Sequence, residues 1–178
     1  MGKTLLFIGW IVLVAAVPAA ADDTANAGLA QALQAAAKWM PDAKLETIST
    51  PLADATGKSR VWQYSFHSPK AGKCVRIQII KGMPLNLIDL GSCIPNKPIS
   101  TKFVDSPIAM QQAMKAGFQP DKDDNSMMLS RSKDRLAKDK ECWNVSSAKD
   151  FDPAKSVMRG WCVDAKSGTF LMRLSGEL

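Results

Sequence analysis

This chain has a single histidine, His67, and no two cysteines at the C-x-x-C spacing of redox and zinc motifs. A Ser-His-Asp or Cys-His centre would therefore have to be built around His67. That residue ends an expected strand just before Ser68 and Pro69. An exposed histidine at a sheet edge is favoured there over a general base.

Metal-binding and acid–base motifs are also missing. Asp121, Asp123 and Asn125 match the first ligands of an EF-hand loop, but Ser126 replaces its glycine and Ser132 its closing glutamate. A solvated acidic loop is the favoured interpretation. A hydrolase could use carboxylates such as Asp105, Asp152 and Asp164. For these three residues the sequence pattern indicates only helix-cap and turn roles. We expect no metal, no other cofactor and no catalytic residues.

Only one long apolar run occurs, and it lies at the N-terminus. Lys3 precedes an apolar stretch at 5–17, and Ala19, Ala20 and Ala21 form a small-residue cleavage site before two aspartates. This order is typical of a secretory signal peptide. We therefore expect residues 1–21 to be removed and the protein to work in the periplasm or outside the cell. A retained membrane span is less favoured, because the run is shorter than the roughly 20 residues that a bilayer requires.

The charge balance is mildly basic. The chain has a formal net charge of +6, and loss of Lys3 with the leader lowers it by one. The densest basic stretch, 131–141, begins with Arg131 and Lys133 but alternates in sign with acidic residues. This alternation favours a solvated surface over a nucleic-acid site, although both residues remain candidates for a binding surface. We expect no nucleic-acid partner and no stable membrane insertion once the leader is removed.

Four cysteines, Cys74, Cys93, Cys142 and Cys162, lie in the part expected to be exported. An oxidising compartment favours disulfides, and an even number of cysteines fits that expectation. Three pairings are possible in principle. The two short gaps are nearly equal, and each encloses an apparent hairpin, so we predict the pairs Cys74–Cys93 and Cys142–Cys162. Each bond should contribute about 3 kcal/mol to stability.

Periodicity predicts one helix followed by about four strands, twice over. Helices are expected at 29–40 and 106–117, and strands at 44–50, 60–67, 74–81, 83–90, 126–133, 142–147, 161–163 and 169–174. The predicted fold class is α+β. It consists of two similar disulfide-stapled halves, each with one helix packed on a curled antiparallel sheet of about four strands. The predicted divisions are a signal peptide at 1–21, a first half at 22–94, a linker at 95–104 and a second half at 105–178.

Aromatic residues are the remaining candidates for a site. Trp62 and Tyr64 share one face of the strand at 60–67. With Trp143 and Trp161, and with Trp39 of the first helix, they could line a ligand cleft or a binding surface. Packing in the core is the favoured alternative, because most tryptophans at such positions simply fill space.

The run from Trp161 to Leu171, W-C-V-D-A-K-S-G-T-F-L, resembles the closing hairpin of PepSY-type domains, in which a strand ends in a V-D-A-x-[ST]-G turn. The helix at 106–117 and the strands after it are similar to the rest of that module. The resemblance covers 105–174 best, and the first half shares only the order of elements, as a second tandem copy would. The four cysteines and the polar insertion at 119–141 depart from the family.

This resemblance implies a cystatin-like helix-on-sheet fold, in a family associated with peptidase propeptides and extracellular regulation. It implies no catalytic residue. We therefore expect a non-enzymatic exported module that recognises an envelope or secreted protein or peptide, a peptidase among them, through a sheet face or edge. The alternatives are a small-molecule or lipid carrier with an apolar pocket under the sheet, and a hydrolase with an unrecognised carboxylate site.

Overall fold

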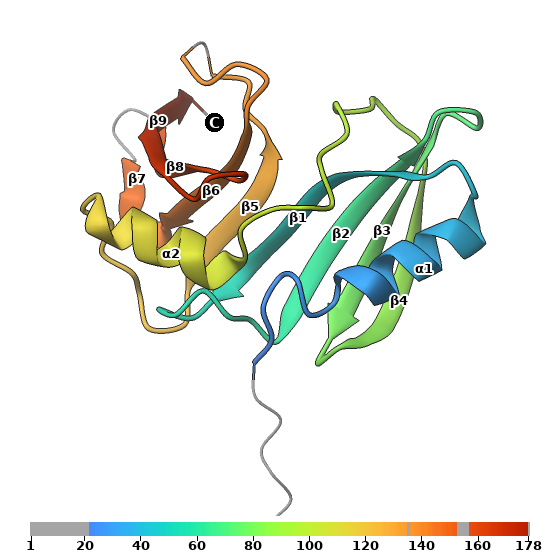
Figure 1. The fold of residues 1–178 in the computed structure, drawn as a ribbon, viewed down its shortest axis with the longest axis horizontal. Coiled ribbons are helices and arrows are strands. Elements are labelled where there is room, and N and C mark those ends of the chain that lie inside the picture. The colour runs from blue at the N-terminus through green and yellow to red at the C-terminus, as the bar shows by residue number, and fades with distance from the viewer. Residues whose placement is uncertain (1–21, 135, 153–156, 178) are drawn as a thin grey trace, which may run out of the picture.

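The computed structural model describes residues 22–134, 136–152 and 157–177 (Figure 1). The predicted signal peptide at 1–21 lies outside these residues. The first helix, α1 (Leu29–Trp39), buries Leu29, Ala32 and Ala36, and Pro41 prevents its continuation. Its approach to the sheet is close. A Cβ on Gly28 would lie 2.8 Å from both Ile79 and Tyr64.

Four consecutive strands follow α1 as an antiparallel meander. They are β1 (Lys44–Ala53), β2 (Val61–Ser68), β3 (Lys73–Ile80) and β4 (Met83–Ser92). The alternation that predicted β2 is confirmed, because Trp62, Tyr64 and Phe66 are all buried on one face. Helix α1 packs over β2, β3 and β4 on that face.

The second half of the chain also begins with a helix, but it contains a 3₁₀ helix and a fifth strand in addition. Helix α2 (Ser106–Lys115) precedes β5 (Asn125–Arg131), β6 (Glu141–Ser147), a short 3₁₀ helix η1 (Ala148–Asp150), β7 (Phe151–Asp152), β8 (Val157–Asp164) and β9 (Phe170–Glu177). The N-cap of α2 is Asp105, whose carboxylate accepts from the N–H of Ser106. The Ser106 hydroxyl accepts from the N–H of Ala25 at 3.1 Å. The start of the described chain is therefore hydrogen-bonded to α2.

All described strands belong to one nine-stranded antiparallel sheet. Its order is β4-β3-β2-β1-β5-β6-β8, with β7 beside β8 on the β6 side and β9 on the other side of β8. Strand β1 is the junction, because Ile48 pairs with Tyr64 of β2 on one side and with Leu129 of β5 on the other. The two long edge strands are therefore β4 and β9 (Figure 1), while the two-residue β7 pairs only with β8 in the described structure.

The predicted fold class is thus wrong. The chain does not form two separate helix-on-sheet halves. It is predominantly one continuous sheet with two short helices. The physical reason lies in β1, which we expected to be a weak strand ending at Thr50. It runs on to Ala53 and donates and accepts hydrogen bonds along both of its edges, so the two meanders are joined.

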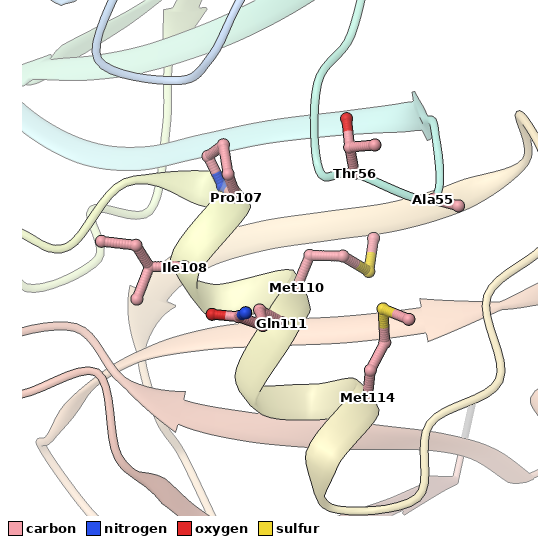
Figure 2. A pocket seen from close by; sticks show the side chains of 7 residues that line it. All are labelled: Ala55, Thr56, Pro107, Ile108, Met110, Gln111 and Met114. Atoms are coloured by element: carbon pink, nitrogen blue, oxygen red, sulfur yellow. The ribbon is translucent and has the colours of Figure 1, made fainter.

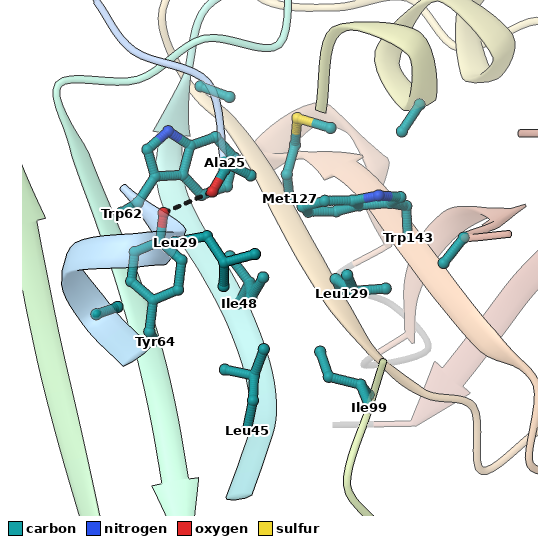
Figure 3. Close-up of a cluster of buried hydrophobic side chains, with 14 of the residues drawn as sticks. Ala25, Leu29, Leu45, Ile48, Trp62, Tyr64, Ile99, Met127, Leu129 and Trp143 are labelled. Carbon is teal, nitrogen blue, oxygen red and sulfur yellow. Dashed lines mark hydrogen bonds between the residues drawn. The ribbon is translucent and has the colours of Figure 1, made fainter. Parts of the chain in front are cut away.

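One hydrophobic core runs beneath both helices (Figure 3). The indole rings of Trp62 and Trp143 meet within it, one from each meander. The segment predicted as a linker, 95–104, connects β4 to α2 and takes part in the core. Its Ile99 is buried, and the Ile99 N–H donates to the carbonyl of Leu45 at 2.9 Å. This segment therefore packs against the junction of the two meanders.

Both predicted disulfides are present. Cys74 is bonded to Cys93 and Cys142 to Cys162, with Cα–Cα distances of 5.9 and 5.5 Å. The first bond links β3 to the residue after β4. The second joins β6 to β8, which are adjacent in the sheet although η1 and β7 lie between them in sequence. Each bond therefore ties neighbouring strands within one meander.

Candidate functional site

The aromatic candidates lie in the core. Trp62, Tyr64, Trp143 and Trp161 are all buried. Each polar tip is satisfied by a backbone carbonyl: Trp62 donates to Asp23, Tyr64 to Ala25, Trp143 to Val104 and Trp161 to Ala116. Packing, the alternative that the sequence favoured, is therefore the arrangement found, and these four side chains do not line a cleft or a surface.

The basic candidates have separate roles. The Arg131 guanidinium donates to the carbonyl of Pro98 at 2.7 Å, to that of Asp139 at 2.8 Å and to the Glu141 carboxylate at 2.8 Å. Arg131 therefore fastens the 95–104 segment to the loop before β6. Lys133 is exposed on that loop. The structure does not bring either residue together with the aromatic candidates.

His67 is not at a sheet edge, contrary to prediction, because β2 lies between β1 and β3. Its side chain is only 13% exposed, and Nδ1 lies 3.9 Å from Oε1 of Glu46. Burial raises the pKa of Glu46, while the backbone N–H of Asn96 and the His67 ring oppose that rise. Glu46 is the extra residue of a bulge in β1. The bulge directs its charged side chain to a buried position.

Neither Glu46 nor His67 is hydrogen-bonded to a hydroxyl group among the described residues. The Ser68 hydroxyl follows His67 in the strand and so points to the opposite face. It donates to the Asp42 carboxylate at 2.8 Å. A hydrolytic triad needs a nucleophile hydrogen-bonded to the histidine, and the described contacts of His67 do not include one.

The other carboxylates have structural roles. Asp105 accepts from the N–H groups of Asn26 and Ser106, as an N-cap. Asp164 accepts from the turn amides of Lys166 and Ser167. Burial alone would raise the pKa of Asp164, but these turn donors outweigh it and lower that pKa. The side chain of Asp152 lies outside the described part of the structure.

The loop that resembles an EF-hand is closed by its own hydrogen bonds. The Asn125 side chain accepts from the N–H of Asp121 at 2.8 Å and donates to the carbonyls of Asp121 and Ala53. The Asp121 carboxylate forms an ion pair with Lys149. No cluster of three or more metal-ligating side chains occurs within the described residues.

An open hollow of about 370 Å³ lies on the outer side of α2 (Figure 2). The 54–58 loop forms its other wall. Its lining is largely apolar and includes two methionines: Ala55, Thr56, Pro107, Ile108, Met110, Gln111 and Met114. The predicted carrier would hold its ligand beneath the sheet, where the described structure has packed tryptophans instead. The hollow is therefore in a different place from the expected pocket.

The strongest candidate for a binding site is the edge of the sheet along β4. In the described structure this ten-residue strand pairs only with β3, so its outer N–H and C=O groups face away from the sheet, although the register with β3 shifts at two places. Pro84 near its start is compatible with an edge, because an edge strand tolerates a missing N–H. Four large apolar side chains are exposed along the strand: Met83, Leu87, Ile88 and Leu90.

The register places these side chains on two faces. Leu87 pairs with the buried Ile77 and therefore points to the side of α1, whereas Ile88 pairs with Arg76 on the open side. Leu87 is 48% exposed and Ile88 39% exposed. Sequence reasoning identified this strand but not its place at an edge. The available signal was the presence of apolar residues at both odd and even positions of L-N-L-I-D-L, which is compatible with a strand but does not indicate an edge.

Comparison with known proteins identifies a fold but not a family. No protein-family model matches this chain, and no curated protein sequence matches it either. The resemblance to PepSY-type domains therefore stays a prediction. A crystal structure of a candidate lipoprotein from Clostridium difficile is similar to this chain, with a TM-score of 0.55 and 17% identity over 89% of this chain and 98% of that chain. At this identity the likeness concerns the fold alone.

Within the described ranges, neither α1 nor α2 combines the length and the apolar character needed to cross a bilayer.

Proposed function

We propose that this protein is an exported, non-enzymatic module that binds an extended segment of an envelope or secreted polypeptide by adding it as a further strand beside β4. The observation that carries the proposal is the long unpaired edge of β4 with its exposed apolar side chains. Strand addition needs only main-chain hydrogen bonds, and side-chain contacts then supply the preference between partners. A peptidase with an extended surface segment is one partner of this kind.

Export is supported by the predicted leader and by the two disulfides, which persist in oxidising compartments. The name of the similar crystal structure, a candidate lipoprotein, fits an envelope location. An acyl chain attached through sulfur would need an unpaired cysteine, and all four cysteines of this chain are paired.

The test uses a neutral peptide of about eight residues with alternating valine and threonine, a length typical of a strand. Its control is the same peptide with alternate backbone nitrogens methylated, which removes the donors needed for pairing. Amide hydrogen exchange followed by NMR should show new protection in β4 with the first peptide and none with the second. Protection at β9 or around the α2 hollow, with β4 unchanged, would contradict the proposed site.

A variant of the edge gives an independent test. Leu87→Lys should weaken binding of the neutral peptide, because an exposed lysine on an edge strand disfavours pairing. Leu52→Lys is the matched control, since Leu52 is an exposed leucine on β1, which β2 and β3 separate from the β4 edge. Equal weakening by both variants would show that the loss is not specific to β4.

A further inference from the structure

Helix α1 borders one side of the β4 edge. The Trp39 indole N–H donates to Oδ2 of Asp89 at 3.4 Å, which joins the end of α1 to β4. Leu87, two residues before Asp89, points to the same side of the strand and is about half exposed. A strand added beyond β4 would place every second side chain beside Leu87 and α1. Apolar side chains at those positions would remove Leu87 from water.

The open side of the same edge carries a partly exposed cation. Arg76 of β3 lies there, because it pairs with Ile88 of β4. It forms no ion pair within the described residues. The single acidic residue between 73 and 92 is Asp89, which lies on the α1 side. It already accepts from the N–H of Gly91 and from Trp39.

We propose that the segment bound along β4 is apolar on the face that meets α1 and acidic on the face that meets Arg76. This inference rests on the proposed function, because it describes the partner of the same edge. The apolar positions pack against Leu87 and α1. The acidic positions lie over the open side of the β3–β4 hairpin, where Arg76 has no ion-pair partner among the described residues.

The same charge argues against a second copy of this chain as the occupant. In an antiparallel β4-to-β4 pair, the open sides of both copies would carry the same unpaired Arg76. The only acid that the partner strand carries is Asp89, which points to α1 and is already hydrogen-bonded. The favoured occupant is therefore an acidic segment of a different polypeptide.

Three peptides of about eight residues test this proposal against the oxidised exported chain: alternating valine–threonine, valine–glutamate and valine–lysine. Dissociation constants would be measured by isothermal titration calorimetry at low and at physiological ionic strength. The glutamate peptide should bind about tenfold more tightly than the threonine peptide, and the lysine peptide more weakly than both. The difference should shrink with added salt, because these charges are exposed.

Two variants, each of which replaces one cation by a glutamate, complete the test. Arg76→Glu should abolish the preference for the glutamate peptide. Lys166→Glu, at an exposed turn beyond β8, should leave that preference intact. If circular dichroism shows that Arg76→Glu does not fold, the salt dependence of the parent chain is used instead. A glutamate preference that does not shrink with added salt would then overturn the acidic partner.

The outcomes separate the two proposals. Failure of all three peptides to bind would overturn strand addition itself. Equal binding of all three, or a glutamate preference that survives in folded Arg76→Glu, would leave strand addition standing and overturn the acidic partner.

Discussion

The indole rings of Trp62 and Trp143 meet edge to face, with centroids 6.1 Å apart and planes inclined at 75° (Figure 3). Trp62 belongs to β2 and Trp143 to β6, so their contact bridges the β1–β5 junction. Both side chains are buried, and Phe103 of the connecting segment packs against Trp143 at 5.9 Å. The two meanders therefore share their largest core residues.

Truncation of Trp143 should consequently destabilise the whole molecule. We expect Trp143→Ala to lower the free energy of unfolding by about 3–5 kcal/mol, because it leaves a large cavity where the meanders meet. Urea titrations followed by far-ultraviolet circular dichroism and by tryptophan fluorescence should share one midpoint. Trp39→Ala should lower the free energy of unfolding by less, because the Trp39 indole is only partly buried. Two separate transitions in the parent chain would show that the meanders unfold independently.

The disulfides make a second prediction. The unreduced, denatured protein should contain no titratable thiol, and reduction should release all four. Replacing either pair by alanines should cost about 3 kcal/mol, because the two loops are nearly equal in length. The two double variants are controls for each other. Thiols found without reduction would contradict the pairing.

Glu46 should make stability depend on pH. Since burial raises the pKa of Glu46 in the folded state, its protonated form favours folding below the ordinary value of 4.5, and this contribution is lost as pH rises through the raised pKa. Glu46→Gln should therefore match the parent in acid and be more stable than the parent at neutral pH. Thermal unfolding across that range measures the difference.

The control for this experiment is Asp123→Asn, which removes one negative charge at an exposed site. It should not reproduce the gain at neutral pH. A loss of stability at neutral pH in Glu46→Gln would show that attraction to His67 outweighs the cost of burying the carboxylate.

Gly160 gives the fourth prediction. A Cβ at this position would collide with Oδ1 of Asn144 on the neighbouring strand. Gly160→Ala should therefore cost about 1–3 kcal/mol, as over-packing does. Asn144→Ala should recover much of that loss, since Oδ1 has no hydrogen-bond partner among the described residues. The coupling energy from a double-mutant cycle measures this relationship, and additive effects would disprove it.

Local pattern predicted most of the elements. The alternation of aromatic residues along β2 and the apolar stripe of α1 placed those elements within a residue or two of their observed bounds. The cysteine spacing predicted both disulfides, because each bond joins strands that are close in sequence as well as in space. Signals of this kind depend only on residues that are close in sequence, so they can be recognised before the fold is known.

Long-range pairing was beyond such signals. Nothing near β1 in the sequence indicates that its second edge binds β5, about 80 residues away, and the strand was expected to stop at Thr50. The prediction of two separate sheets failed at this point. The meeting of Glu46 with His67 was also hidden, because it depends on a bulge that turns one side chain inward.

By itself, the sequence determined the cysteine pairing and the identity of the core faces, and it predicted an export signal, because these follow from residue type and short-range spacing. Only the tertiary structure decided that β1 joins two meanders into one sheet and that β4 is left at its edge. Backbone hydrogen-bonding groups are the same in every residue except proline, so which strands pair, and which edge stays open, depends on how the whole core packs.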